Sequence, residues 1–119
     1  MTGPLECALS GEVELPHSPS FLFEALLRSA PEANLTVTTA DRESLQIRGR
    51  LPTTLFFWGP EVTLRVDRVG AELALVRYEA RGTARRPGQD ERFREYIRTR
   101  LSRLLRDAVV LLEPERVGA

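Results

Sequence analysis

The chain has 119 residues, of which 42% are hydrophobic and 29% are charged, and its formal net charge is zero. These values are typical of one globular domain and exclude a disordered or collagen-like chain. The longest apolar runs are much shorter than the roughly 18 to 20 residues that cross a membrane. We therefore expect a single domain over residues 1–119, without a membrane span.

The N-terminal residues, the single cysteine and the single histidine set further limits. Glu6 stands near the start and no basic residue precedes it, unlike in a secretory signal, so we expect a cytoplasmic protein. Cys7 and His17 are too few soft ligands for a structural zinc site. We expect an unreactive, partly buried Cys7, a loop position for His17, and neither a metal ion nor a cofactor.

A strand and a short helix are predicted at the start of the chain. Residues 11–15 alternate apolar and acidic side chains, as a half-buried strand does. Ser18 can cap the helix that follows, and Pro19 suits its first turn, where no backbone donor is needed. Apolar residues then recur at helical spacing, and Pro31 ends the run.

Four strand-like segments come next, around residues 34–38, 45–50, 61–67 and 72–81. Each alternates apolar and polar side chains, and the turns between them are short, which predicts antiparallel pairing. In the last segment Ala74, Val76, Tyr78 and Ala80 share one face. A loop is expected at residues 82–88.

From Asp90 onward the apolar residues follow helical steps of four and three, and Pro114 is predicted to end the helix. The stripe comprises Phe93, Ile97, Leu101, Leu104, Ala108 and Leu112. The predicted class is α+β, with the order β-α-β-β-β-β-α. One face of an antiparallel sheet of about five strands is then covered by the short N-terminal helix and the long C-terminal amphipathic helix.

All 17 basic residues are Arg, and they are unevenly distributed. Residues 76–106 hold ten Arg and four acidic residues, a net charge of +6, whereas the rest of the chain carries −6. Arg makes planar, bidentate contacts with carboxylates and phosphates, so this segment can attract an anionic partner. The basic surface that we expect comprises Arg81, Arg85, Arg86, Arg92, Arg103 and Arg106.

The run Phe56-Phe57-Trp58 is the most suggestive local feature. Neighbouring side chains of a strand point to opposite faces, so at least one ring must point away from the core unless the chain bends. The favoured interpretation tucks the rings under the helices at the end of the sheet. A lid over a ligand pocket and a self-association surface are the functional alternatives.

Glu79 lies between Arg77 and Arg81 on the predicted polar face of the sheet and could act as a tuned acid. An ion pair on a solvated sheet is the favoured interpretation. The chain contains no phosphate-binding glycine pattern and no spacing that supports a catalytic triad. The sequence therefore favours a binding protein over an enzyme.

The segment from Glu12 to Pro19, which leads into Phe21 to Leu26, resembles the first strand and following helix of the helix-grip fold of the START and polyketide-cyclase-like superfamily. The predicted C-terminal helix also resembles the long C-terminal helix of that fold. In that fold a curved antiparallel sheet wraps a long C-terminal helix, and this chain is a shortened version that lacks some of the usual strands. The resemblance implies a protein that binds hydrophobic small molecules and only sometimes catalyses.

Residues 60–104 are also similar to an uncharacterised bacterial family of unknown function. The similarity lies in the segments 76–82 and 87–90 and in Phe93-Arg94, although the serines of that family's motif are missing here. This resemblance implies a bacterial protein and adds no activity.

The first functional hypothesis is an apolar pocket between the sheet and the C-terminal helix, which holds a small hydrophobic ligand. Its predicted lining is Trp58, Val62, Leu64, Val76, Tyr78 and Tyr96. The pocket would have space for the ligand because three residues are small, Gly49, Ala74 and Ala80. That space could instead be filled by the phenylalanines Phe21, Phe23, Phe56 and Phe93.

The second hypothesis is a homo-oligomeric structural or interaction module, with a homodimer as its simplest form. The third is weak nucleic-acid binding through the Arg-rich residues 81–106. The neutral total charge and a pI near 6.6 argue against nucleic acid.

Overall fold

The computed structural model describes residues 5–113. The elements are β1 (Glu6–Leu15), α1 (Pro19–Ser29), the short 3-10 helix η1 (Ala30–Ala33), β2 (Thr36–Asp41), β3 (Gln46–Arg50), β4 (Phe57–Gly70), β5 (Leu73–Ala84) and α2 (Asp90–Leu112). This order confirms the predicted α+β class. Pro114, which was expected to end the last helix, lies outside the described residues.

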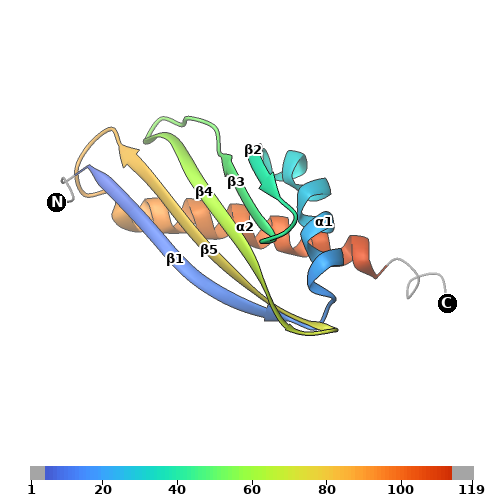
Figure 1. Cartoon of the computed structure of the whole chain (residues 1–119). Coiled ribbons are helices and arrows are strands. Elements are labelled where there is room, and N and C mark those ends of the chain that lie inside the picture. The colour runs from blue at the N-terminus through green and yellow to red at the C-terminus, as the bar shows by residue number, and fades with distance from the viewer. Residues whose placement is uncertain (1–4, 114–119) are drawn as a thin grey trace.

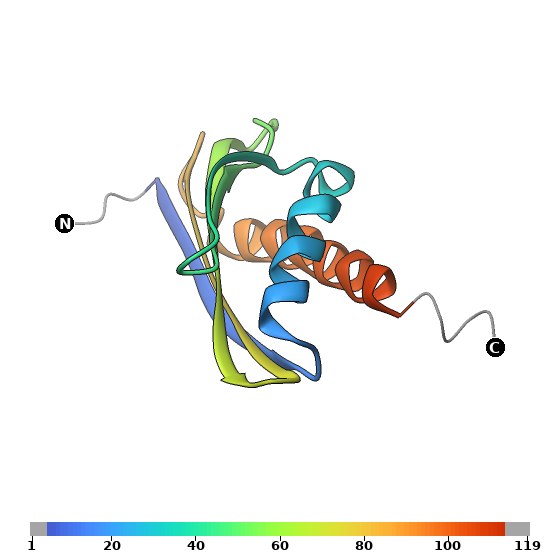
Figure 2. The ribbon, with the colours of Figure 1, turned by 45° about the vertical axis from the view of Figure 1, so that its right-hand side comes forward.

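The strands form one antiparallel sheet in the order β1-β5-β4-β3-β2. The first strand therefore pairs with the last, and β1 and β2 form the two edges. Figures 1 and 2 show the two-layer arrangement, in which α1 and α2 lie on the same side of the curved sheet and α2 runs behind the strands. Among the described residues, no helix is long and apolar enough to cross a membrane.

The core lies between the sheet and the two helices. The apolar stripe of α2 is buried from Phe93 to Ala108, and Leu22, Phe23 and Leu26 supply the buried face of α1. Across β4 and β5 these helices meet apolar side chains that stand in register, such as Val62 opposite Ala80. The periodicity of each element is therefore explained by one shared core.

Three strands are longer than the sequence pattern predicts. β1 begins at Glu6 and β5 continues to Ala84, because the two strands stay paired as far as Glu6 opposite Thr83. β4 begins at Phe57, and a bulge between Trp58 and Glu61 interrupts its alternation. The expected loop at residues 82–88 therefore starts only after Ala84.

Ion pairs cover the outer face of the sheet, as the sequence predicts. Arg77 contacts both Asp67 at 2.9 Å and Glu12 at 3.7 Å, and so joins β5 to its two neighbours. Glu79 pairs with Arg81 at 2.7 Å, and both side chains are at least half exposed. These solvated pairs contribute little to stability.

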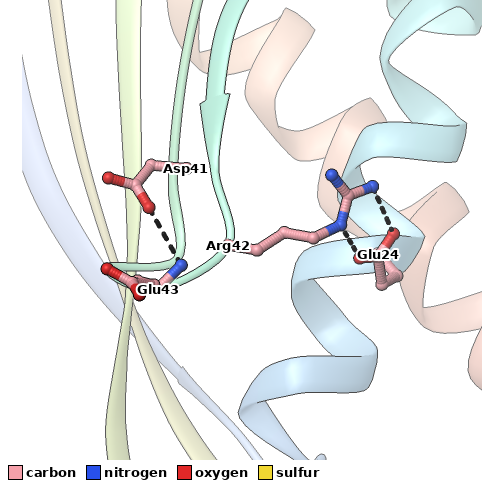
Figure 3. A network of polar contacts seen from close by, with 4 residues as sticks. All are labelled: Glu24, Asp41, Arg42 and Glu43. Atoms are coloured by element: carbon pink, nitrogen blue, oxygen red, sulfur yellow. Dashed lines mark hydrogen bonds and ion pairs between the residues drawn. The ribbon is translucent and has the colours of Figure 1, made fainter.

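A polar contact ties α1 to the turn between β2 and β3 (Figure 3). The Arg42 guanidinium donates hydrogen bonds of 2.7 and 3.4 Å to the two carboxylate oxygens of Glu24. In the same turn the Asp41 carboxylate accepts bonds from the backbone N–H groups of Glu43 and Ser44, which lower the pKa of Asp41. The hairpin is thus held against the helix layer at an exposed position.

Candidate functional site

Half of the predicted pocket lining belongs to a packed core. Val62, Leu64 and Val76 are 1%, 2% and 0% exposed and lie in one cluster with the buried faces of α1 and α2. Of the four phenylalanines that could fill this space, Phe23 and Phe93 do so.

Phe21 and Phe56 are instead 67% and 39% exposed. Phe57, at 1% exposure, completes the aromatic part of the core.

Neighbouring side chains occupy the places where the sheet has no side chain of its own. A Cβ atom on Gly49 would lie 2.9 Å from Cδ1 of Leu35, and one on Gly82 would lie 2.7 Å from Cε1 of Phe93. The Tyr78 ring covers Gly11 in the same way. Of the three small residues that were expected to leave room, Gly49 is covered by Leu35, and Ala74 and Ala80 are 0% exposed.

Two other predicted lining residues take different positions. Tyr78 is half-buried over Gly11 towards the β1 edge, where it packs against the margin of the core. Trp58 is 53% exposed and alternates with the buried Phe57, so it points away from the sheet–helix core. Periodicity alone does not show which residue of an aromatic run faces inward.

A groove lies outside the core, between the connection that precedes β4 and the outward side of the first half of α2. We call it the helix–loop groove, and its volume is about 900 Å³. It is lined by Thr54, Phe56, Phe57, Gly88, Gln89, Glu91, Arg92, Glu95, Tyr96, Thr99, Arg100 and Arg103. Tyr96 is the only predicted pocket residue in this lining.

Aromatic rings form the inner wall of the helix–loop groove. Phe57 stacks on Tyr96 with 6.0 Å between centroids and packs edge-on against Phe93 at 5.2 Å. Phe56 lies 6.3 Å from Phe57 and is more exposed. The wall is fixed from behind, since Phe57 and Phe93 belong to the core.

Arginine side chains cover the rim of this wall. The Arg92 guanidinium lies 3.9 Å from the centroid of Phe56, and that of Arg100 lies 5.4 Å from the centroid of Tyr96. The Tyr96 hydroxyl donates a hydrogen bond of 3.4 Å to the Pro52 carbonyl. Partial burial raises the pKa of Tyr96, and the nearby Arg100 acts in the opposite direction.

Part of this groove could be predicted from the sequence. Arg92, Tyr96 and Arg100 are spaced four residues apart, which places them on one helix face beside the apolar stripe. Pattern reasoning does not show that the connection after β3 folds back to bring Phe57 onto Tyr96. That contact joins residues 39 positions apart and depends on how α2 crosses the sheet.

The predicted basic residues lie on two faces of the protein. Arg81 pairs with Glu79 on the outer face of the sheet, and Arg92 and Arg103 line the helix–loop groove. Arg85 and Arg86 line a neighbouring hollow that shares Phe56 and Gln89 with the groove, and Arg106 lines one that shares Thr99 and Arg103 with it. Nucleic-acid binding through one Arg-rich face and the homo-oligomeric module both stay predictions.

The remaining candidate residues lie outside the helix–loop groove. Burial raises the pKa of the Cys7 thiol to about 11, and the side chain is 5% exposed. His17 lies 3.6 Å from Glu113 near the start of α1. A further hollow of about 720 Å³ on the outer sheet face is lined by the ion-paired Glu12, Arg77, Glu79 and Arg81 together with eight other residues. Within residues 5–113 no three His, Cys, Asp or Glu side chains are grouped to hold a metal ion.

Comparison with known proteins gives matches at the level of structure. No family model matches the chain, and no curated protein matches its sequence. The Zhui aromatase/cyclase from Streptomyces sp. R1128 superposes with a TM-score of 0.62 at 11% identity, over 91% of this chain and 96% of that one.

Two further structures show the same likeness. A START superfamily protein from Mycobacterium smegmatis has a TM-score of 0.60 at 12% identity, over 84% of this chain and 92% of that one. The norcoclaurine synthase from Thalictrum flavum, in complex with dopamine and hydroxybenzaldehyde, has a TM-score of 0.58 at 9% identity, over 92% and 88%. Together with the strand order and the position of α2, these matches show that the chain has the helix-grip fold of the START and polyketide-cyclase-like proteins.

Proposed function

We propose that this protein binds a small, flat aromatic ligand that carries a negative charge, and that the helix–loop groove is its binding site. One observation carries the proposal. The rigid Phe57–Tyr96 stack faces the groove, and the Arg100 guanidinium lies 5.4 Å from the Tyr96 ring. An aromatic ligand could stack on this wall while its anionic group meets the guanidinium.

The size and lining of the groove agree with a small-molecule site. Its volume of about 900 Å³ lies within the range of common ligand pockets, roughly 300 to 1,000 Å³. The aromatic wall supplies apolar contact, and a few polar side chains stand around it. Thr99 and Gln89 can orient a ligand through hydrogen bonds, which is the usual division of roles in such sites.

The charges in the groove favour an anion at one end. Glu91 and Glu95 belong to the first two turns of α2, whereas Arg100 and Arg103 follow one to three turns later. Arg103 is only loosely engaged, since it lies 3.9 Å from Asp107 on its own helix. We therefore place the ligand's ring on Tyr96, which the buried Phe57 supports from the core side, and its negative group towards Arg100 and Arg103.

The sequence hypothesis of a small hydrophobic ligand is retained, but its place is changed. A ligand between the sheet and α2 would have to displace Val62, Leu64 and Val76 from a filled core. Two structural relatives support an aromatic ligand. One is an aromatase/cyclase, and the other is a synthase that holds dopamine and hydroxybenzaldehyde.

Three naphthalene derivatives test the proposal, because they share one ring system and differ in charge. Isothermal titration calorimetry compares 2-naphthoate, 2-naphthol and 2-naphthylmethylammonium. The proposal predicts that the naphthoate binds most tightly and the ammonium compound least. Replacement Arg100→Gln should lower naphthoate affinity about tenfold, as the loss of one charge-assisted contact does, and leave naphthol binding unchanged.

Tyr96→Leu should weaken all three compounds, because it removes the stacking surface. Arg98→Gln is the matched control, since Arg98 is an exposed residue of the same helix that lies outside the groove lining. Equal binding of the anionic and cationic compounds, or equal losses in Arg98→Gln and Arg100→Gln, would overturn the proposal.

A further inference from the structure

Large apolar side chains are exposed at one end of the sheet, where the chain enters β4. Leu55, Phe56 and Trp58 are 85%, 39% and 53% exposed. We call these three residues the apolar tip. In Figure 1 the connection between β3 and β4 lies at the end of the sheet opposite the β4–β5 turn, so the apolar tip stands at an extremity of the molecule.

Hydrogen bonds hold the apolar tip in this exposed conformation. The Thr54 hydroxyl accepts bonds of 3.1 and 3.0 Å from the backbone N–H groups of Phe56 and Phe57. The backbone N–H of Arg85 donates to the Phe56 carbonyl at 2.8 Å, and the Arg85 side chain donates to the Thr54 carbonyl at 3.1 Å. These hydrogen bonds within the turn therefore keep the apolar tip exposed.

Two arginines flank the apolar tip. The Arg85 guanidinium lies 4.0 Å from the centroid of the Trp58 ring, and Arg86 is exposed beside it. A hollow of about 490 Å³ is lined by Leu55, Phe56, Arg85, Arg86 and Gln89. Among the described residues, no acidic side chain lines this hollow, although α2 begins nearby with Asp90 and Glu91.

We propose that the apolar tip docks this protein on an anionic lipid bilayer. Tryptophan is favoured at the membrane–water boundary, where its ring lies in an apolar layer and its N–H remains near polar groups. Leu55 and Trp58 enter that boundary, and Arg85 and Arg86 contact lipid phosphates above it. Basic side chains next to a small apolar insertion give reversible, salt-sensitive attachment.

Other partners fit these observations less well. In a symmetric dimer centred on the tip, Arg85 and Arg86 of one copy would face the same arginines of the other, and like charges repel. A nucleic acid would use the Trp58 ring for stacking, but it gives no role to Leu55, the most exposed member of the tip. A lipid surface accounts for the aliphatic, aromatic and basic groups together.

Trp58 is the only tryptophan of the chain, and its fluorescence therefore reports on the tip directly. The full chain is titrated with phosphatidylcholine vesicles, with and without roughly 30% phosphatidylglycerol, at low and at high salt. The proposal predicts a blue shift of the emission with the anionic vesicles, a much smaller shift with the neutral ones, and reversal by salt. Co-sedimentation of the protein with the vesicles confirms attachment.

Surface variants separate the parts of the proposal. Leu55→Ser should weaken vesicle binding at least about fivefold, because it removes an inserted aliphatic group. The double change Arg85→Gln and Arg86→Gln should abolish the preference for anionic lipid. Val69→Ser is the matched control, since Val69 is 54% exposed at the opposite end of the sheet, and it should bind like the unchanged protein.

Absence of a shift with anionic vesicles would overturn the proposal. A shift that grows with protein concentration without lipid would assign the tip to a second copy, and one produced only by single-stranded DNA would assign it to nucleic acid. This docking does not depend on the proposed ligand. Phe56 belongs to both surfaces, but Leu55, Trp58, Arg85 and Arg86 lie outside the groove lining, so variants of these four residues test the docking without changing the groove.

Discussion

At the scale of single residues, small positions on the inner face of the sheet decide whether the fold has an interior pocket. Gly49 was expected to leave space, but Leu35 occupies it, and Phe93 lies in the same way against Gly82. Such a space cannot be predicted from sequence. Whether a glycine faces a void or a ring depends on side chains that are distant along the chain, here 14 and 11 residues away.

Cys7 allows a test of the packing at this scale. Burial raises the pKa of its thiol from 9.0 to about 11, so at about pH 8 the native protein should hold about 100-fold less thiolate than the unfolded chain. We predict at least that ratio between the rates of iodoacetamide alkylation in urea and in buffer. In buffer the rate should continue to rise beyond pH 9.

The thiol also contributes to the pH dependence of stability. The unfolded chain releases the Cys7 proton first, so stability is retained below about pH 9 and falls as the pH rises towards 11. Circular dichroism confirms that the protein is still folded where the rates are compared. Similar alkylation rates in urea and in buffer would show that Cys7 is exposed and that β1 is not packed as described.

At the scale of elements, α2 carries both the core and the groove. Its periodic stripe made the helix predictable, because six apolar residues at steps of three and four are typical of an amphipathic helix. The antiparallel pairing of successive strands from β2 to β5 was predictable from the short turns, whereas the pairing of β1 with β5 was not. The bulge after Trp58 and the extension of β5 to Ala84 were not, since they depend on partners in β1 and β4.

The two faces of α2 should respond differently to truncation. Leu104 is 1% exposed, so Leu104→Ala should lower the free energy of unfolding by about 2 to 5 kcal/mol. Val110, on the same helix, is 63% exposed, and Val110→Ala should change it by less than about 0.5 kcal/mol. Urea unfolding followed by circular dichroism measures both. Equal effects would contradict the assignment of the buried face.

At the scale of the whole molecule, the chain combines the helix-grip arrangement with a filled interior. The space between the sheet and α2 holds Phe23, Phe57 and Phe93, while the helix–loop groove lies outside it. The fold was therefore predictable as an architecture, and the position of the candidate site was not. Tyr96 is the one residue that the sequence hypothesis and the groove share.

A ligand in the helix–loop groove should leave the interior of the protein intact. The most direct test is a two-dimensional amide NMR spectrum of the protein, recorded during titration with 2-naphthoate. The largest shifts are predicted at Phe57, Tyr96, Thr99 and Arg100, with little change at Val62, Leu64 and Val76. The opposite result, with the largest shifts at these three core residues, would show that the ligand opens the space between the sheet and α2 and would contradict the account.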